Sequence, residues 1–190
     1  MPDKYPKLDS TPQYAHDPYR WLKQAKELDR AAMLIWEAIR KDFELMSLAP
    51  IGTTLSEAEI PNAGLGDVFW LNAGFALENL LKGLIVQNNP SSVINGIITK
   101  NLKTHNLIAL AKRVPLDLEI RDAFFLDIGT RCITWAGRYP CSINLMGSKP
   151  FVFSEADVMV YRSLFNKLSS RIIDNKSENN SRMIRLFRLC

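Results

Sequence analysis

The sequence predicts an all-α, up-down bundle of about five helices with two long loop insertions. Three observations lead to this fold class. Apolar residues recur every three or four positions in several segments, as they do on one face of a helix. The segment 67–86 is apolar on nearly every face, which is typical of a helix buried on all sides. The sequence also shows no convincing run of strands and no internal repeat.

The composition is that of one globular domain: 190 residues, of which 47% are hydrophobic and 23% charged. The N-terminus lacks the apolar core of a signal peptide. The segment 67–86 is long enough to span a membrane, but its central Glu78 and Lys82 make insertion expensive. We therefore expect a cytoplasmic protein without a membrane span.

The charge and the metal-ligating residue types restrict the possible ligands. A net charge of +4 permits an anionic partner. Three cysteines without a secretory signal indicate free thiols rather than a disulfide framework. The cysteines lack metal-ligand spacing and the two histidines are far apart, so we expect neither a metal site nor a cofactor.

The first part of the chain is predicted to contain an extended arm and a long helix. Residues 1–18 hold four prolines and many polar groups, which favours the arm. The helix begins near Pro18, with Asp17 as its N-cap. It carries one apolar stripe: Trp21, Ala25, Leu28, Ala32, Ile35, Ile39, Phe43 and Met46.

The segment 67–86 is predicted to be a central helix with Asp67 as its N-cap. Glu78 and Lys82 stand four residues apart on it; an ordinary intrahelical pair is favoured over the alternative that they line a polar groove. The polar insertions 47–66 and 87–103 flank this helix, and loops of such length are often functional or mobile.

Three further helices are predicted in the second half. Thr104 caps a short one over 105–113, and a longer one runs from Asp117 to about Gly137. Ser154 and Asp157 resemble a capping box that opens the last main helix. Residues 174–181 form a polar break, so the bundle spans 19–175 and a basic amphipathic tail spans 176–190. The apolar faces of the last two long helices are Phe125, Ile128, Cys132 and Trp135, and Val158, Tyr161, Phe165, Leu168 and Ile172.

Four short segments follow one another in a recognisable order. The first helix contains WLKQAKELDRAA and the central helix contains FALENLLKGLIV. A later helix starts with Lys-Thr-His-Asn-Leu at 103–107, and a late helix ends in Arg-Tyr-Pro at 138–140. Together these segments resemble the HEPN domain, a small helical bundle common in bacterial and archaeal proteins. The resemblance runs from about Tyr19 to Pro140 or Ile173.

The resemblance implies a dimer-forming bundle linked to RNA cleavage, nucleotide binding or toxin–antitoxin pairing. Members that cleave RNA carry an arginine followed a few residues later by a histidine, which suits phosphate binding and proton transfer. Arg131 and Arg138 occupy the corresponding helix, but no histidine follows either of them. We therefore expect no catalytic residues of this type.

The best candidate for a ligand site is a polar stripe on the helix that starts near Asp117. Its residues recur at spacings of four, three and four, and arginine offers a planar fork suited to phosphate. Tyr139 suits stacking on a base as well as packing at the helix end. A solvated or dimer-interface face remains the more common reading of such a stripe, and a structural role is the more common one for His105. The full candidate set is Asp127, Arg131, Thr134, Arg138, Tyr139, Lys103 and His105.

These features lead to three hypotheses. The first is a non-catalytic HEPN-like binding module, expected to be a homodimer, for a nucleotide, RNA or a nucleotidyltransferase-type protein in a toxin–antitoxin or defence-like system. The second is a divergent metal-independent ribonuclease that uses Arg131 or Arg138 with Asp127 or Tyr139 as the base. The third is a purely structural interaction domain.

Overall fold

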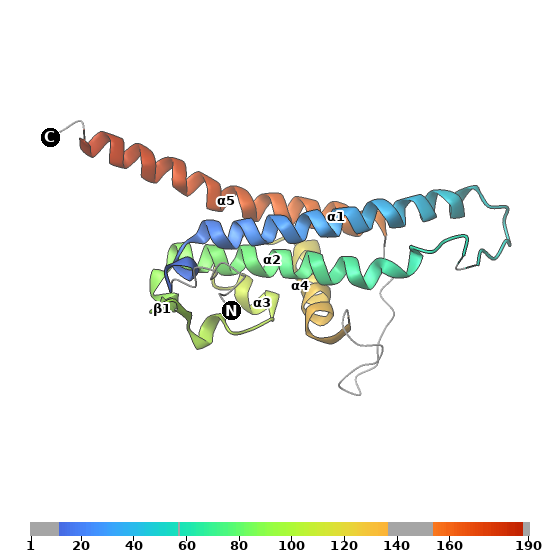
Figure 1. Ribbon diagram of the computed structural model, residues 1–190, viewed down its shortest axis with the longest axis horizontal. Helices are drawn as coiled ribbons and strands as arrows, with labels where there is room; N and C mark the ends of the chain where they lie inside the picture. The colour runs from blue at the N-terminus through green and yellow to red at the C-terminus, as the bar shows by residue number, and fades with distance from the viewer. Residues whose placement is uncertain (1–11, 57, 137–153, 188–190) are drawn as a thin grey trace, which may run out of the picture.

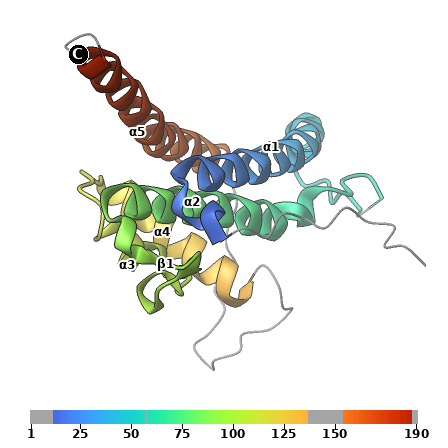
Figure 2. The ribbon, with the colours of Figure 1, turned by 60° about the vertical axis from the view of Figure 1, so that its left-hand side comes forward.

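The computed structural model describes residues 12–56, 58–136 and 154–187, and it is an all-α bundle. Five α-helices occur in this part of the chain, together with one two-stranded sheet. The central helix α2 (Gly66–Asn88) lies between α1 (Pro18–Leu48) and α5 (Glu155–Phe187) on one side and α3 (Leu107–Ala111) and α4 (Ile120–Arg131) on the other (Figures 1 and 2). The predicted fold class is confirmed.

Helix α1 begins as predicted. The Asp17 carboxylate accepts a hydrogen bond from the backbone N–H of Tyr19 at 2.9 Å, and Pro18 occupies the first turn. The preceding segment Pro12–His16 forms a 3-10 helix (η1), so this part of the predicted arm is not extended. The indole N–H of Trp21 on α1 donates to the carbonyl of Ala15 at 3.0 Å, and this hydrogen bond holds the segment against the start of α1.

The buried face of α1 differs from the predicted stripe at its edges and at its end. Leu22 and Trp36, outside the stripe, are buried, whereas Met46 is exposed. Both α2 and α5 contact α1, so its buried face is wider than one line of residues. Met46 belongs to the last turn of α1, and the end of α1 extends past the start of α2 (Figure 1).

Helix α2 is the buried centre of the bundle, since 14 of its 23 residues are buried. It begins at Gly66, one residue before the predicted N-cap, so Asp67 lies in the first turn rather than at the cap. The cap prediction is therefore wrong, but a carboxylate in the first turn still complements the helix dipole. No helix in the described part of the chain is long and apolar enough to cross a membrane.

A close approach between α2 and α4 depends on glycine. A Cβ atom on Gly74 would lie 2.6 Å from Cγ2 of Ile133 and 3.2 Å from the carbonyl oxygen of Gly129. Ile133 belongs to a π-helical turn (η5, Cys132–Ala136) that continues α4. The absence of a side chain at Gly74 therefore allows the end of α4 to pack directly on α2.

The predicted insertion 87–103 contains the sheet. After the 3-10 helix η3 (Pro90–Ser92), strands β1 (Val93–Ile94) and β2 (Ile97–Ile98) pair antiparallel, and the 3-10 helix η4 (Lys100–Leu102) follows. Asn95 and Gly96 have φ of 51° and 76°, the conformation of a two-residue hairpin turn. The expectation of no strands is thus wrong here, because the Asn-Gly turn permits a hairpin of only two residues per strand. The insertion 47–66 contains the 3-10 helix η2 (Ala63–Leu65).

The two helices that follow start later than predicted. The N-cap of α3 is Asn106, whose side chain accepts from the N–H of Ala109 at 2.8 Å, and not Thr104. Helix α4 begins at Ile120 rather than near Asp117, because Glu119 and Asp122 form a reciprocal capping box.

Helix α5 has the predicted buried face, and Val158, Tyr161, Phe165, Leu168 and Ile172 are all buried. The backbone N–H of Ser154 donates to the Asp157 carboxylate at 2.9 Å, as one half of the expected box. The helix continues through 174–181, so the predicted break is wrong; this segment contains neither Pro nor Gly to end a helix. The C-terminal half of α5 projects away from the other helices (Figures 1 and 2).

Polar contacts attach α5 to α1. The hydroxyl of Tyr161 and the guanidinium of Arg162 both donate to the Asp29 carboxylate at 2.9 Å. The hydroxyl of Tyr19 donates to the carbonyl of Ile172 at 2.9 Å. These bonds satisfy polar groups beside the apolar core and fix how the two long helices pack.

Candidate functional site

Two charged side chains are buried in the middle of α2. Nζ of Lys82 lies 2.6 Å from Oε1 of Glu78, and their side chains are only 8% and 7% exposed. The predicted intrahelical pair therefore exists, but it is not the ordinary surface pair that the sequence suggested. Burying a carboxylate and an ammonium is tolerable only because each neutralises the other and both find hydrogen-bond partners.

The second carboxylate oxygen of Glu78 contacts His105. Its Oε2 atom lies 2.8 Å from Nδ1 of the imidazole. An ionised carboxylate can only accept hydrogen bonds, so Nδ1 carries a proton and donates a hydrogen bond to Glu78. The other ring nitrogen, Nε2, belongs to a side chain that is 51% exposed. In a neutral ring Nε2 can accept a proton or a hydrogen bond, and in a charged ring it can donate to an anion.

The backbone around His105 is held in place by polar contacts to α4. The hydroxyl of Thr130 accepts from the N–H of Leu107 at 2.9 Å and donates to the carbonyl of Leu126 at 2.8 Å. The hydroxyl of Thr104 accepts from the N–H of Asn106 at 3.1 Å. The ring of Phe75 on α2 lies edge-on to the imidazole, with 6.1 Å between centroids. His105 is therefore positioned by three elements: α2, the start of α3, and α4.

The predicted polar stripe begins on the exposed side of α4. The guanidinium of Arg131 donates from Nε to Oδ2 of Asp127 at 3.0 Å, and the two side chains are 45% and 50% exposed. The hydroxyl of Thr134 donates to the carbonyl of Thr130 at 2.7 Å. Thr130 thus lies next to both the stripe and the start of α3, so it connects the two candidate regions.

The π-helical turn changes the spacing on which the stripe was predicted. A π-helix bonds each N–H to the fifth residue before it and rotates later side chains around the axis. Thr134 lies within this turn, and its hydroxyl bonds back to the helix backbone. Arg138 and Tyr139 lie outside the described residues, so their place relative to Arg131 stays a prediction.

Lys103, the Cys132 thiol and the possible metal ligands remain to be placed. The side chain of Lys103, two residues before His105, is exposed. Burial raises the pKa of the Cys132 thiol to about 12, which makes this cysteine a poor nucleophile. Within the described residues, no three His, Cys, Asp or Glu side chains are close enough to hold a metal ion.

The sequence interpretation missed Glu78 and Lys82 as parts of the site. The two residues were predicted as an intrahelical pair, and His105 was considered separately, with a structural role as the more common one. The available signal was the presence of two charges in the centre of an otherwise apolar helix. Such charges need additional partners, and His105 is the one that the fold supplies.

Together, the fold and the site define an all-α bundle in which a buried ion pair holds a half-exposed histidine. Comparison with protein-family models, with curated proteins and with solved structures found no match to the chain. Any functional conclusion therefore depends on the side chains of this protein.

Proposed function

We propose that the chain is a non-catalytic HEPN-like binding module that works as a homodimer and binds the phosphate groups of RNA or a nucleotide. The observation that carries this proposal is the contact between His105 and the buried Glu78–Lys82 pair. It fixes an imidazole at the surface, where a protonated ring donates to phosphate oxygens. A nucleotidyltransferase-type protein, as in a toxin–antitoxin or defence-like system, is the proposed protein partner.

The charge near His105 supports an anionic ligand. Lys103 is exposed two residues before the histidine, and the chain has a net charge of +4. Arg131 is paired with Asp127, so its charge is partly compensated, and we assign it a secondary role. A cationic surface of this kind binds phosphates with an affinity that falls as salt rises.

The test is binding of a short single-stranded RNA across a salt series, with the RNA checked for integrity afterwards. Lys103→Gln should weaken binding and reduce the slope of log K against log salt by about 0.7 for each phosphate that Lys103 neutralises. His105→Gln should weaken binding at every salt concentration, because it removes a ring that Glu78 holds in place.

Lys26→Gln is the matched control. It removes the same charge from an exposed position on α1, which lies on the other side of α2 from α3 (Figure 1). The proposal predicts that this variant binds RNA like the unaltered protein. Equal losses for Lys26→Gln and Lys103→Gln, or no binding at low salt, would contradict it.

The second candidate function is a metal-independent ribonuclease. A histidine whose Nδ1 donates to a carboxylate has the arrangement of an oriented general base, and Glu78 gives His105 that arrangement. In this case the RNA is cleaved during the binding experiment and His105→Gln abolishes cleavage. Cleavage that persists in pure His105→Gln protein would exclude His105 as the base.

A further inference from the structure

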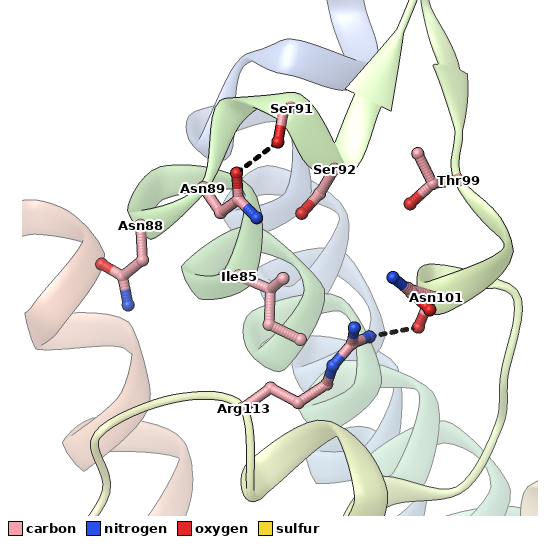
Figure 3. Close-up of a pocket in the computed structure, with 8 residues that line it drawn as sticks. All are labelled: Ile85, Asn88, Asn89, Ser91, Ser92, Thr99, Asn101 and Arg113. Carbon is pink, nitrogen blue, oxygen red and sulfur yellow. Dashed lines mark hydrogen bonds between the residues drawn. The ribbon is translucent and has the colours of Figure 1, made fainter.

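A polar pocket lies at the C-terminal end of α2, where the insertion 87–103 folds back toward the end of α3 (Figure 3). Its volume is about 210 Å³. Four segments build it: the last turn of α2 with η3, the end of the hairpin, η4, and the residues after α3. The lining residues are Ile85, Asn88, Asn89, Ser91, Ser92, Thr99, Asn101 and Arg113.

One hydroxyl in this pocket is buried without a partner. Oγ1 of Thr99 makes no hydrogen bond to any described residue. Ser92, which is only 7% exposed, lies opposite it, and the backbone N–H of Thr99 donates to the Ser92 carbonyl at 2.9 Å. Both hydroxyl oxygens lie on the side of their residues that faces the interior of the pocket (Figure 3). A buried hydroxyl without a protein partner is unfavourable, so a group bound in the pocket would gain a hydrogen bond from it.

The other polar groups of the pocket favour a negatively charged ligand. The guanidinium of Arg113 donates to the backbone carbonyl of Asn101 at 2.5 Å, which fixes its position at the edge of the pocket. Oδ1 of Asn89 accepts from the hydroxyl of Ser91 at 2.5 Å, so the side-chain N–H₂ of Asn89 remains available as a donor. None of the described residues that line the pocket carries a carboxylate. One full positive charge and several donors thus surround the space.

We propose that this pocket binds a small oxyanion, namely a phosphate group that is either free or the terminal group of a phosphomonoester. The planar guanidinium of Arg113 supplies the positive charge, and the hydroxyls of Ser92 and Thr99 supply neutral hydrogen bonds. The volume of 210 Å³ is below the range of roughly 300–1,000 Å³ typical of pockets that enclose a whole drug-sized ligand. The pocket therefore takes the phosphate and leaves the rest of a larger molecule outside. This site shares no residue with the one around His105.

The experiment is calorimetric titration with inorganic phosphate at constant ionic strength, with chloride as the reference anion. We expect saturable binding with a dissociation constant of about 1 mM or tighter. Adenosine monophosphate and adenosine form the second arm. Tighter binding of the monophosphate than of phosphate assigns the pocket to phosphomonoesters, and equal binding assigns it to the free anion. Absence of saturation with both would overturn the proposal.

Three variants locate the binding. Thr99→Val keeps the shape of the side chain and removes the hydroxyl, so phosphate should bind about tenfold more weakly, while the ligand-free protein melts at the same or a higher temperature. Arg113→Met should abolish detectable binding. Lys112→Met removes an exposed charge next to Arg113 that does not line the pocket, and it should bind phosphate normally. Unchanged affinity in Thr99→Val and Arg113→Met would overturn the assignment, even if the protein binds phosphate elsewhere.

Discussion

Two acid–base pairs in this protein have the same sequence spacing and very different surroundings. Glu78 precedes Lys82 by four residues on α2, and Asp127 precedes Arg131 by four residues on α4. The first pair is less than a tenth exposed and has a third partner, His105, whereas the second is about half exposed. Sequence spacing therefore determines which side chains form an ion pair, while burial determines how much stability is lost when one partner of the pair is removed.

The largest expected effect comes from breaking the buried pair. Glu78→Leu leaves the ammonium of Lys82 buried without a counter-charge, so unfolding free energy should fall by about 3–5 kcal/mol. Denaturant unfolding monitored by circular dichroism measures this loss. The double variant Glu78→Leu with Lys82→Met removes both charges and should recover most of the stability. A double variant as unstable as Glu78→Leu alone would show that the charge was not the cause.

Removing the third partner should have a smaller effect. His105→Leu eliminates the hydrogen bond to Oε2 of Glu78 but leaves the contact with Lys82, so we expect a loss of about 1.5 kcal/mol. The same denaturation experiment measures it. A loss that persists when His105→Leu is combined with Glu78→Leu would mean that the histidine contributes independently of the carboxylate.

The residue after Arg131 is a buried thiol, Cys132, whose ionisation makes the stability of the protein depend on pH. Burial raises the pKa of the Cys132 thiol from 9.0 to about 12, and the Asp67 carboxylate adds to the shift. An unfolded chain ionises this thiol near pH 9 while the folded protein keeps it neutral. The stability that the group contributes is therefore intact below pH 9 and is lost as the pH rises toward 12.

Cys132→Ala serves as the comparison for this effect. The difference in unfolding free energy between the two proteins should be constant below pH 9 and should shrink above it. A difference that stays constant up to pH 12 would contradict the burial of the thiol.

The smallest effect is expected for the exposed pair. Arg131→Gln should change the unfolding free energy by no more than about 0.5 kcal/mol, because water already solvates both partners. Asp127→Asn should have an effect of the same size. A loss of several kcal/mol for either variant would mean that this pair is part of a buried interface, such as the contact between two subunits.

The sequence predicted the Glu78–Lys82 pair but not its contact with His105. Spacing alone was sufficient for Glu78 with Lys82, and periodicity identified the buried face of α5. The contact of Glu78 with His105 bridges 27 residues, including a hairpin, so no local pattern could reveal it. The Asn95–Gly96 turn was visible as a hairpin signal, although two residues per strand are too few to show alternation.

The π-helical turn explains why the stripe could be predicted only in part. The prediction assumed a regular helix from Asp127 to Arg138, whereas the structure has a π-helical turn at Cys132–Ala136 that packs against α2 near Gly74. That packing is a tertiary effect. Local sequence therefore placed Asp127 with Arg131 correctly and could not determine how the later residues are rotated.

The most direct test of this account is the tautomer of His105, measured by nitrogen NMR on the two ring nitrogens at a pH where the ring is neutral. We predict that Nδ1 carries a proton and donates a hydrogen bond to Glu78. We also predict that Nε2 is unprotonated in the free protein and gains a proton when RNA is added, because only a protonated Nε2 can donate to phosphate. A proton on Nε2 in the RNA-free protein, or an RNA response equal at both nitrogens, would contradict the claim that a buried ion pair holds this histidine for a ligand.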